Sequence, residues 1–171
     1  RAGWSPCCAA SRAGRDGNGA MSEQQAALSI ERIYLKDLSL EIPNAPHVFA
    51  EREAPKIDIS LHNEARALDA GLYEVVLTAT VTAKLKDKTA FLVEAAQAGI
   101  FRIQNVAQPD LDAVLGIACG NILFPYLRES ISNTVVRGGF PPFWLSHLSF
   151  DALYHQQRQQ QQQQAGAPPA T

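Results

Sequence analysis

The sequence predicts an α+β fold: a four-stranded antiparallel sheet, with a long kinked helix and a second C-terminal helix on one face. Apolar and polar residues alternate over residues 30–97, whereas a helical period takes over from Pro109. Strands placed first and helices last favour helices packed on one face of an antiparallel sheet. The 171 residues and 46% hydrophobic content suggest one domain with a sizeable core.

The first two strands are expected near residues 30–42 and 56–62. In the first, apolar side chains alternate with polar ones: Leu38, Leu40 and Ile42 against Asp37, Ser39 and Glu41. Pro43 and Pro46 then interrupt the ladder, because proline has no backbone N–H to donate. In the second strand, Ile57, Ile59 and Leu61 alternate with polar neighbours.

Residues 73–83 form the most regular predicted strand, because β-branched residues and strict alternation coincide there. A polar turn at residues 86–88 follows, and residues 89–97 return as a fourth strand. The third and fourth strands are therefore expected to form an antiparallel hairpin.

The long helix is expected to begin at Asp110 as its cap and to end at Gly138 and Gly139. Its predicted apolar face comprises Leu111, Leu115, Ala118, Ile122, Leu127, Ile131 and Val135. Pro125 lies in the middle, and a kink is expected there because proline lacks the N–H and its ring clashes with the preceding turn.

Ser149 is expected to cap the second helix, which contains Phe150, Leu153 and Tyr154. Residues 156–171 form a glutamine-rich tail without an apolar face and are expected to be disordered. Residues 1–20 are interpreted as an upstream translation or cloning extension, with a genuine N-terminal extension as the alternative. The folded domain is then expected over residues 21–155.

Charge and hydropathy exclude several classes of function. Residues 1–20 contain three arginines and one aspartate, so the rest of the chain carries 12 basic and 16 acidic side chains. This net charge of −4 argues against nucleic-acid binding. No apolar run approaches the roughly 18 residues of a membrane span, and residues 1–20 lack the apolar core of a secretion signal.

No catalytic constellation is evident, and no cofactor is expected. The four histidines are scattered without metal-ligand spacing, and neither a nucleophile motif nor a phosphate-binding loop occurs. Cys119 lies in an apolar helical context and is expected to be buried and inert. With no disulfide framework, the chain is expected in the cytoplasm.

Several segments resemble the SecB family of bacterial protein-export chaperones. The best are residues 33–37 (IYLKD), 43–49 (PNAPHVF), 73–77 (YEVVL), 121–129 (NILFPYLRE) and 150–153 (FDAL). The resemblance implies an ATP-independent holdase that binds unfolded secretory precursors, keeps them translocation-competent and delivers them to the motor SecA. It also implies a homotetramer, built as a dimer of dimers with the long helices between the dimers.

The residues alone make a solvated sheet face the simpler interpretation of Asp37, Glu41, Leu92 and Glu94. In the family, the matching positions form the acidic docking surface for SecA. The resemblance therefore predicts that these four residues bind SecA.

A cluster of aromatic residues within positions 140–154 favours either a core under a loop or the wall of a promiscuous groove. By resemblance, the client-binding groove comprises Val48, Phe49, Ile57, Phe140, Phe143, Trp144, Leu148, Phe150 and Leu153. The best-known member of the family has a tryptophan in the segment after Phe49, where this chain has Glu53 or its neighbours. That aromatic contact is therefore either missing or supplied by Trp144.

The long helix has more apolar surface than one sheet face needs, and such a surplus usually packs in a subunit interface. Resemblance assigns this interface to Val93, Ala95, Gln97, Leu115, Ile122 and Tyr126. Two alternatives remain at this point: a SecB-like chaperone dedicated to one partner such as an antitoxin, and an oligomeric structural binding module.

Overall fold

Four antiparallel strands and a long helical segment form the body of the protein. The computed structural model describes residues 26–165, with side chains as far as Gln159 except Gln157. The strands are β1 (Ala27–Glu41), β2 (Lys56–Asp69), β3 (Leu72–Leu85) and β4 (Lys88–Gln104), and a short helix η1 (His47–Ala50) joins the first two. All four strands are longer than the sequence alternation predicted.

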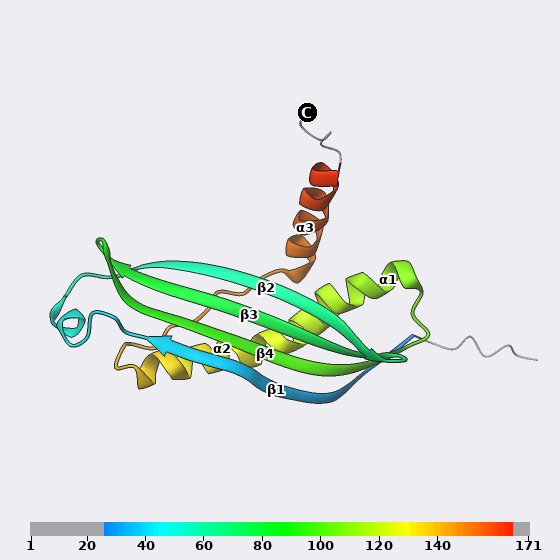
Figure 1. Cartoon of the computed structure of the whole chain (residues 1–171), viewed down its shortest axis with the longest axis horizontal. Coiled ribbons are helices and arrows are strands. Elements are labelled where there is room, and N and C mark those ends of the chain that lie inside the picture. Colours follow the sequence, from blue (N-terminus) through cyan, green and yellow to red (C-terminus); the bar gives the residue numbers. More distant parts are fainter. Residues whose placement is uncertain (1–25, 166–171) are drawn as a thin grey trace, which may run out of the picture.

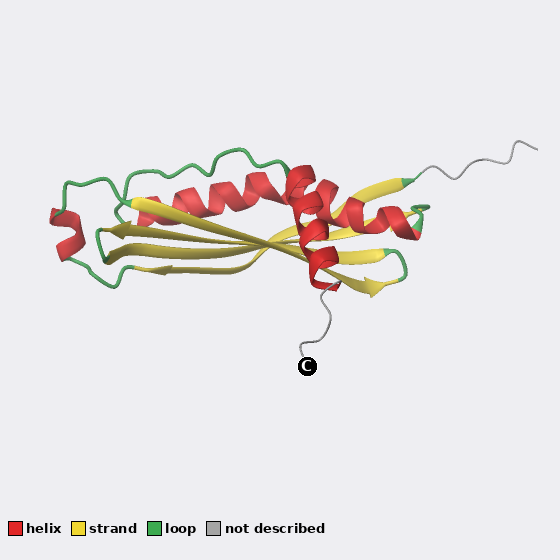
Figure 2. Ribbon diagram, turned by 90° about the horizontal axis from the view of Figure 1, so that it is seen from above, coloured by secondary structure: helices red, strands yellow, loops and turns green. Residues whose placement is uncertain are grey.

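The sheet has the order β1-β4-β3-β2, and every neighbouring pair is antiparallel. The predicted hairpin of the third and fourth strands is therefore confirmed. Figure 1 looks onto the sheet with α2 behind it, and Figure 2 shows the two layers from above, with the long helical segment on one face. We call the helix-covered side the inner face and the opposite side the outer face.

Strand β1 keeps its apolar residues on the inner face by means of two β-bulges. Register shifts occur between Ile30 and Arg32 and between Leu35 and Asp37. Each bulge adds one residue and reverses the alternation of side chains. Six apolar residues consequently pair with inner-face positions of β4: Leu28, Ile30, Ile33, Leu35, Leu38 and Leu40.

The core lies between the inner face and the helical layer. Five alternate residues of β3 are fully buried: Val75, Leu77, Ala79, Val81 and Ala83. They match the predicted alternation, which is therefore confirmed for this strand. On β4, Phe91, Val93 and Ala95 are buried while Leu92 and Glu94 are partly exposed, as the sequence indicated.

The helical segment runs as α1 (Gln108–Ala113), a π-helical turn η2 (Val114–Ala118) and α2 (Cys119–Arg137). The predicted apolar face is one residue out of register before Pro125, because Cys119 and Leu123 are fully buried instead of Ala118 and Ile122. A π turn accommodates an extra residue, and this shifts the buried face.

Pro125 does not break the helix. It lies inside α2, on the exposed side, and the helix continues through it to Arg137. A π turn at Val114–Ala118 interrupts the α-helical geometry earlier in the segment, and the sequence analysis did not anticipate it. Because Pro125 is exposed, water can satisfy the carbonyl that loses its partner to proline.

Of the predicted helix ends, the one at Asp110 is wrong and the ones at Gly138–Gly139 and Ser149 are confirmed. The cap assigned to Asp110 is wrong, since α1 begins after Ala107 and Asp110 lies in its first turn. At the other end, α2 ends at Arg137, and Gly139 adopts a positive φ of 86° that favours glycine. Ser149 caps α3 (Phe150–Ala165), because its Oγ accepts the N–H of Ala152 at 3.3 Å.

Helix α3 starts against the helical layer and then projects past the β2 edge of the sheet (Figure 1). A Cβ placed on Gly120 would lie 2.6 Å from the ring of Phe150, and one on Gly116 would lie 2.8 Å from the ring of Tyr154. These two glycines therefore allow the close approach of α3. The helix continues through Ala165, into the glutamine-rich segment, whereas residues 1–25 and 166–171 lie outside the described part.

The joined helix Gln108–Arg137 is long and apolar enough to cross a membrane by length and composition, with a mean hydropathy of 1.3 over its best window. The expectation that no such segment exists is therefore wrong. One such helix does not indicate a membrane span, because the core helix of a folded domain can have the same length and composition. Leu123, Leu127 and Ile131 of this helix are fully buried in the core, as a packed helix requires.

Candidate binding surfaces

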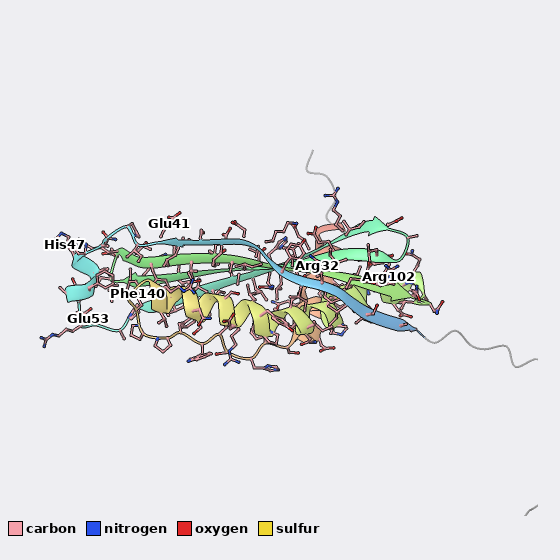
Figure 3. The ribbon with its side chains drawn as sticks, turned by 90° about the horizontal axis from the view of Figure 1, so that it is seen from below. Arg32, Glu41, His47, Glu53, Arg102 and Phe140 are labelled. Carbon is pink, nitrogen blue, oxygen red and sulfur yellow. The ribbon has the colours of Figure 1, made fainter. Side chains whose placement is uncertain are left out.

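An apolar groove of about 510 Å³ opens at the end of the molecule where η1, the β3–β4 turn and the loop after α2 meet. Figure 3 shows Phe140, His47 and Glu53 at this end, with Arg32 and Arg102 at the other. Five of the nine predicted groove residues line it: Val48, Phe49, Ile57, Phe140 and Phe143. The sequence analysis missed Leu85, Ala90 and Phe91, which also line it.

Three aromatic rings form the floor and one wall of this groove. Phe140 packs between Phe91, at a centroid distance of 4.8 Å, and Phe49, at 5.2 Å. Phe91 is buried, whereas half of Phe49 is exposed (50%). The half-exposed Phe49 packs on Phe140, which in turn packs on the buried Phe91, so Phe49 offers apolar area to a ligand without unfolding the site.

Glu53 lies in the groove, in the segment where the sequence analysis expected an aromatic contact to be missing or supplied by Trp144. It lines the groove and pairs with Lys86, whose Nζ lies 3.0 Å from its Oε1. Trp144 does not replace that aromatic contact, because it lines a separate cavity of about 420 Å³ with Arg128, Glu129 and His147. The Arg128 guanidinium lies 5.5 Å from the centre of the Trp144 ring. Trp144 is therefore removed from the groove wall.

The other predicted groove residues lie nearer α3. Phe150 and Leu153 line a small pocket beneath Tyr154, and Leu148 packs against the core. In that pocket Asn63 donates to the carbonyl of Gly116 at 3.3 Å, while its Oδ1 is buried without a partner. The predicted groove thus divides into a large apolar groove at one end of the molecule and a pocket of about 30 Å³ beside α3.

The four residues predicted to bind SecA share the outer face. Glu41 lies opposite Leu92, and Ser39 lies opposite Glu94, so Asp37 and Glu41 flank Glu94 diagonally. Figure 3 shows Glu41 on the side of the sheet away from α2. We call Asp37, Glu41, Leu92 and Glu94 the acidic face.

Hydrogen bonding fixes part of the acidic face. Thr80 on β3 donates from Oγ1 to Oε2 of Glu94 at 2.9 Å. None of the three carboxylates forms an ion pair with any residue in the described part of the chain. Their charge is therefore available to a basic partner.

A second polar cluster lies further along the outer face. Lys36 donates to Oε1 of Glu74 at 2.8 Å, and the hydroxyl of Tyr34 donates to the same oxygen. The hydrogen bond from Lys36, followed by that from Tyr34, lowers the pKa of Glu74. The same carboxylate and partial burial raise the pKa of Tyr34. Glu74 is thus a carboxylate with two fixed donors.

The predicted interface residues divide into two groups. Val93, Ala95, Gln97 and Leu115 are buried within the protomer, whereas Ile122 is partly exposed and Tyr126 is about half exposed. The exposed apolar surface that the sequence analysis missed lies on the β1 edge and on α2: Leu28, Ile30, Leu35, Leu38 and Val136. Knowledge of the two β1 bulges would have been needed to find the strand part of this surface.

Metal binding requires a cluster of ligating side chains, and thiol chemistry requires a reactive cysteine. No group of three or more His, Cys, Asp or Glu side chains within residues 26–165 could hold a metal ion. Cys119 is fully buried, and this burial raises the pKa of its thiol to about 12. A thiol with such a pKa is a poor nucleophile at neutral pH.

A four-stranded sheet backed by one long helix, with an apolar groove at one end and carboxylates on the outer face, defines an α+β protein whose described surfaces suit the binding of other chains. The fold is shared with a solved SecB-like chaperone of Mycobacterium tuberculosis, in complex with a peptide from an antitoxin. That comparison has a TM-score of 0.61 at 18% identity and covers 71% of this chain and 90% of that one.

Sequence comparison identifies the family. The family profile described as preprotein translocase subunit SecB matches residues 21–161. The protein-export protein SecB of Methylobacillus flagellatus is 57% identical over 148 residues, which cover 86% of this chain and 94% of the relative. That of Chromobacterium violaceum is 59% identical over 140 residues, 80% of this chain and 93% of the relative. The chain belongs to the SecB family of protein-export chaperones.

Proposed function

We propose that this protein is an ATP-independent holdase that binds unfolded secretory precursors, keeps them translocation-competent and delivers them to SecA. The apolar groove carries the client-binding part of the proposal. Its half-exposed Phe49 and partly buried Phe140 and Phe143 offer apolar contacts that need no particular client sequence. A protein that binds unfolded but not native clients holds them unfolded by mass action.

Release then follows from transfer to a second partner. The acidic face lies on the opposite side of the sheet from α2, so a bound SecA and a bound client need not compete for the same residues. Asp37, Glu41 and Glu94 form no ion pair within the described residues, and Leu92 lies at one end of this group, opposite Glu41. The group therefore suits a basic surface that also offers a small apolar contact. Differential affinity, and no hydrolysis, would drive the transfer.

The exposed apolar residues support the oligomer that we propose. Leu28, Ile30, Leu35 and Leu38 along the β1 edge, with Tyr126 and Val136 on α2, would be covered in a homotetramer built as a dimer of dimers. A long apolar edge strand is otherwise a site of aggregation. The free, buried Cys119 agrees with a cytoplasmic location.

A dedicated single partner is less well supported. The relatives at 57% and 59% identity are named protein-export proteins, whereas the antitoxin complex belongs to a relative at 18% identity. The high-identity relatives therefore favour export clients.

Binding measurements on two variants test the proposal. Asp37→Lys or Glu94→Lys should weaken SecA binding about tenfold or more while leaving capture of an unfolded precursor intact. Capture is measured by size exclusion with light scattering, with the native precursor as the control. Equal loss of both activities, or equal capture of native and unfolded precursor by the wild type, would contradict the assignment.

A further inference from the structure

A lysine adjoins the acidic face in sequence but is directed away from it. Lys36 immediately precedes Asp37, and its flexible four-carbon stem could carry the ammonium group to that carboxylate. In the structure its Nζ lies 2.8 Å from Oε1 of Glu74 instead. Glu74 is on β3, so this contact crosses the intervening strand β4.

The bulge in β1 and a small residue on β4 make the crossing possible. Lys36 is the extra residue of the bulge between Leu35 and Asp37. Ala98 of β4 pairs with Tyr34 on one side and Val76 on the other, and it is fully buried although it belongs to the outer face. Its methyl group leaves room for the Tyr34 ring to reach across to Glu74.

Glu74 binds Lys36 better than an exposed carboxylate would. Its side chain is only 12% exposed, and Tyr34 donates a second hydrogen bond to the same oxygen. These donors keep Glu74 ionised, as the lowered pKa of its carboxyl reflects. Asp37 is exposed, and an ion pair there would be screened by water and worth little.

We propose that Glu74 is a positioning residue that holds Lys36 away from the acidic face and thereby preserves the affinity of that face for a basic partner. This role rests on the proposed docking of SecA. Without Glu74, the ammonium of Lys36 would lie free beside Asp37. It would then offset one of the three carboxylates and repel a basic surface.

The test compares SecA affinities of the full-length oligomer at low ionic strength. Glu74→Gln keeps the side-chain shape and should weaken SecA binding about threefold. The double variant Lys36→Gln with Glu74→Gln should restore the wild-type affinity, because it removes the released cation. At high ionic strength the difference should vanish, since salt screens exposed charges.

Two further variants separate this role from others. Glu64→Gln removes one carboxylate from the same outer face, where Glu64 pairs with His62 at 3.0 Å. An equal loss for Glu64→Gln and Glu74→Gln, or no rescue by the double variant, would overturn the positioning role. If Glu94→Gln weakens SecA binding and Glu74→Gln does not, the positioning role of Glu74 is overturned but the docking of SecA on the acidic face stands. If Glu94→Gln does not weaken SecA binding, the docking of SecA is overturned as well. Unfolded-precursor capture and denaturant midpoints of all variants confirm that they are folded.

Discussion

Substitution of Phe49 by alanine should weaken client binding much more than it destabilises the protein. A phenylalanine side chain has about 200 Å² of surface to bury, and half of Phe49 is exposed, which leaves about 100 Å² for a client. At about 25 cal/mol per Å², that area is worth about 2.5 kcal/mol. Ordering the client offsets part of this gain, so we expect a loss of about tenfold or more in affinity.

The matched control is Trp144→Ala. Trp144 is also an exposed aromatic residue (61%), but it lines the separate cavity beside Arg128. It should change client affinity by less than about twofold, because none of its surface faces the groove. Affinity is measured by fluorescence anisotropy of a labelled, unfolded precursor, and stability by chemical denaturation.

The reverse result would refute the groove assignment. Phe49→Ala leaves the buried Phe91 beneath Phe140, so it should lower the unfolding free energy by only about 1–2 kcal/mol and remain folded. Unchanged client affinity in this variant, together with a tenfold loss in Trp144→Ala, would place the client beside Arg128 and not in the groove.

Two other predictions concern stability. Gly120→Ala should lower the denaturation midpoint, with an overpacking cost of about 1–3 kcal/mol, because its Cβ would meet the buried Phe150 at 2.6 Å. Gly116→Ala is the control, since Tyr154 is partly exposed and can move, and a midpoint as low as that of Gly120→Ala would contradict this reasoning. The folded pKa of Glu74 lies below 4.5, so its contribution is present above that pH and is lost as the pH falls through the folded value. Glu74→Gln should therefore make stability less sensitive to pH below 4.5, and identical acid limbs for variant and wild type would count against the Lys36–Glu74 contact.

Local patterns determined the elements of this protein. The alternation of residues 73–83 predicted the buried face of β3, Gly139 marked the end of α2, and Ser149 marked the start of α3. Such features depend on neighbouring residues only, so a single sequence contains the information. The placement of Asp37, Glu41, Leu92 and Glu94 on one face also followed, because strand side chains alternate.

Irregular geometry limited these predictions. The π turn at Val114–Ala118 moved the buried positions by one residue, and the bulges of β1 brought Leu35 and Leu38 to the same face. A bulge or a π turn inserts one residue into a periodic element, and no composition signal marks the point of insertion. The exposed apolar edge of β1 could therefore not be found from its alternation.

By itself, the sequence determined a strand-rich domain backed by one long helix, with a polar outer face and a mostly apolar inner one. Tertiary structure alone decided that Trp144 packs beside Arg128 and not in the groove, and that Lys36 pairs with Glu74 and not with Asp37. Trp144 and Arg128 are distant along the chain, and Lys36 has two carboxylates within reach, Asp37 and Glu74. That choice depends on burial and on the path across neighbouring strands, and both exist only once the sheet is assembled.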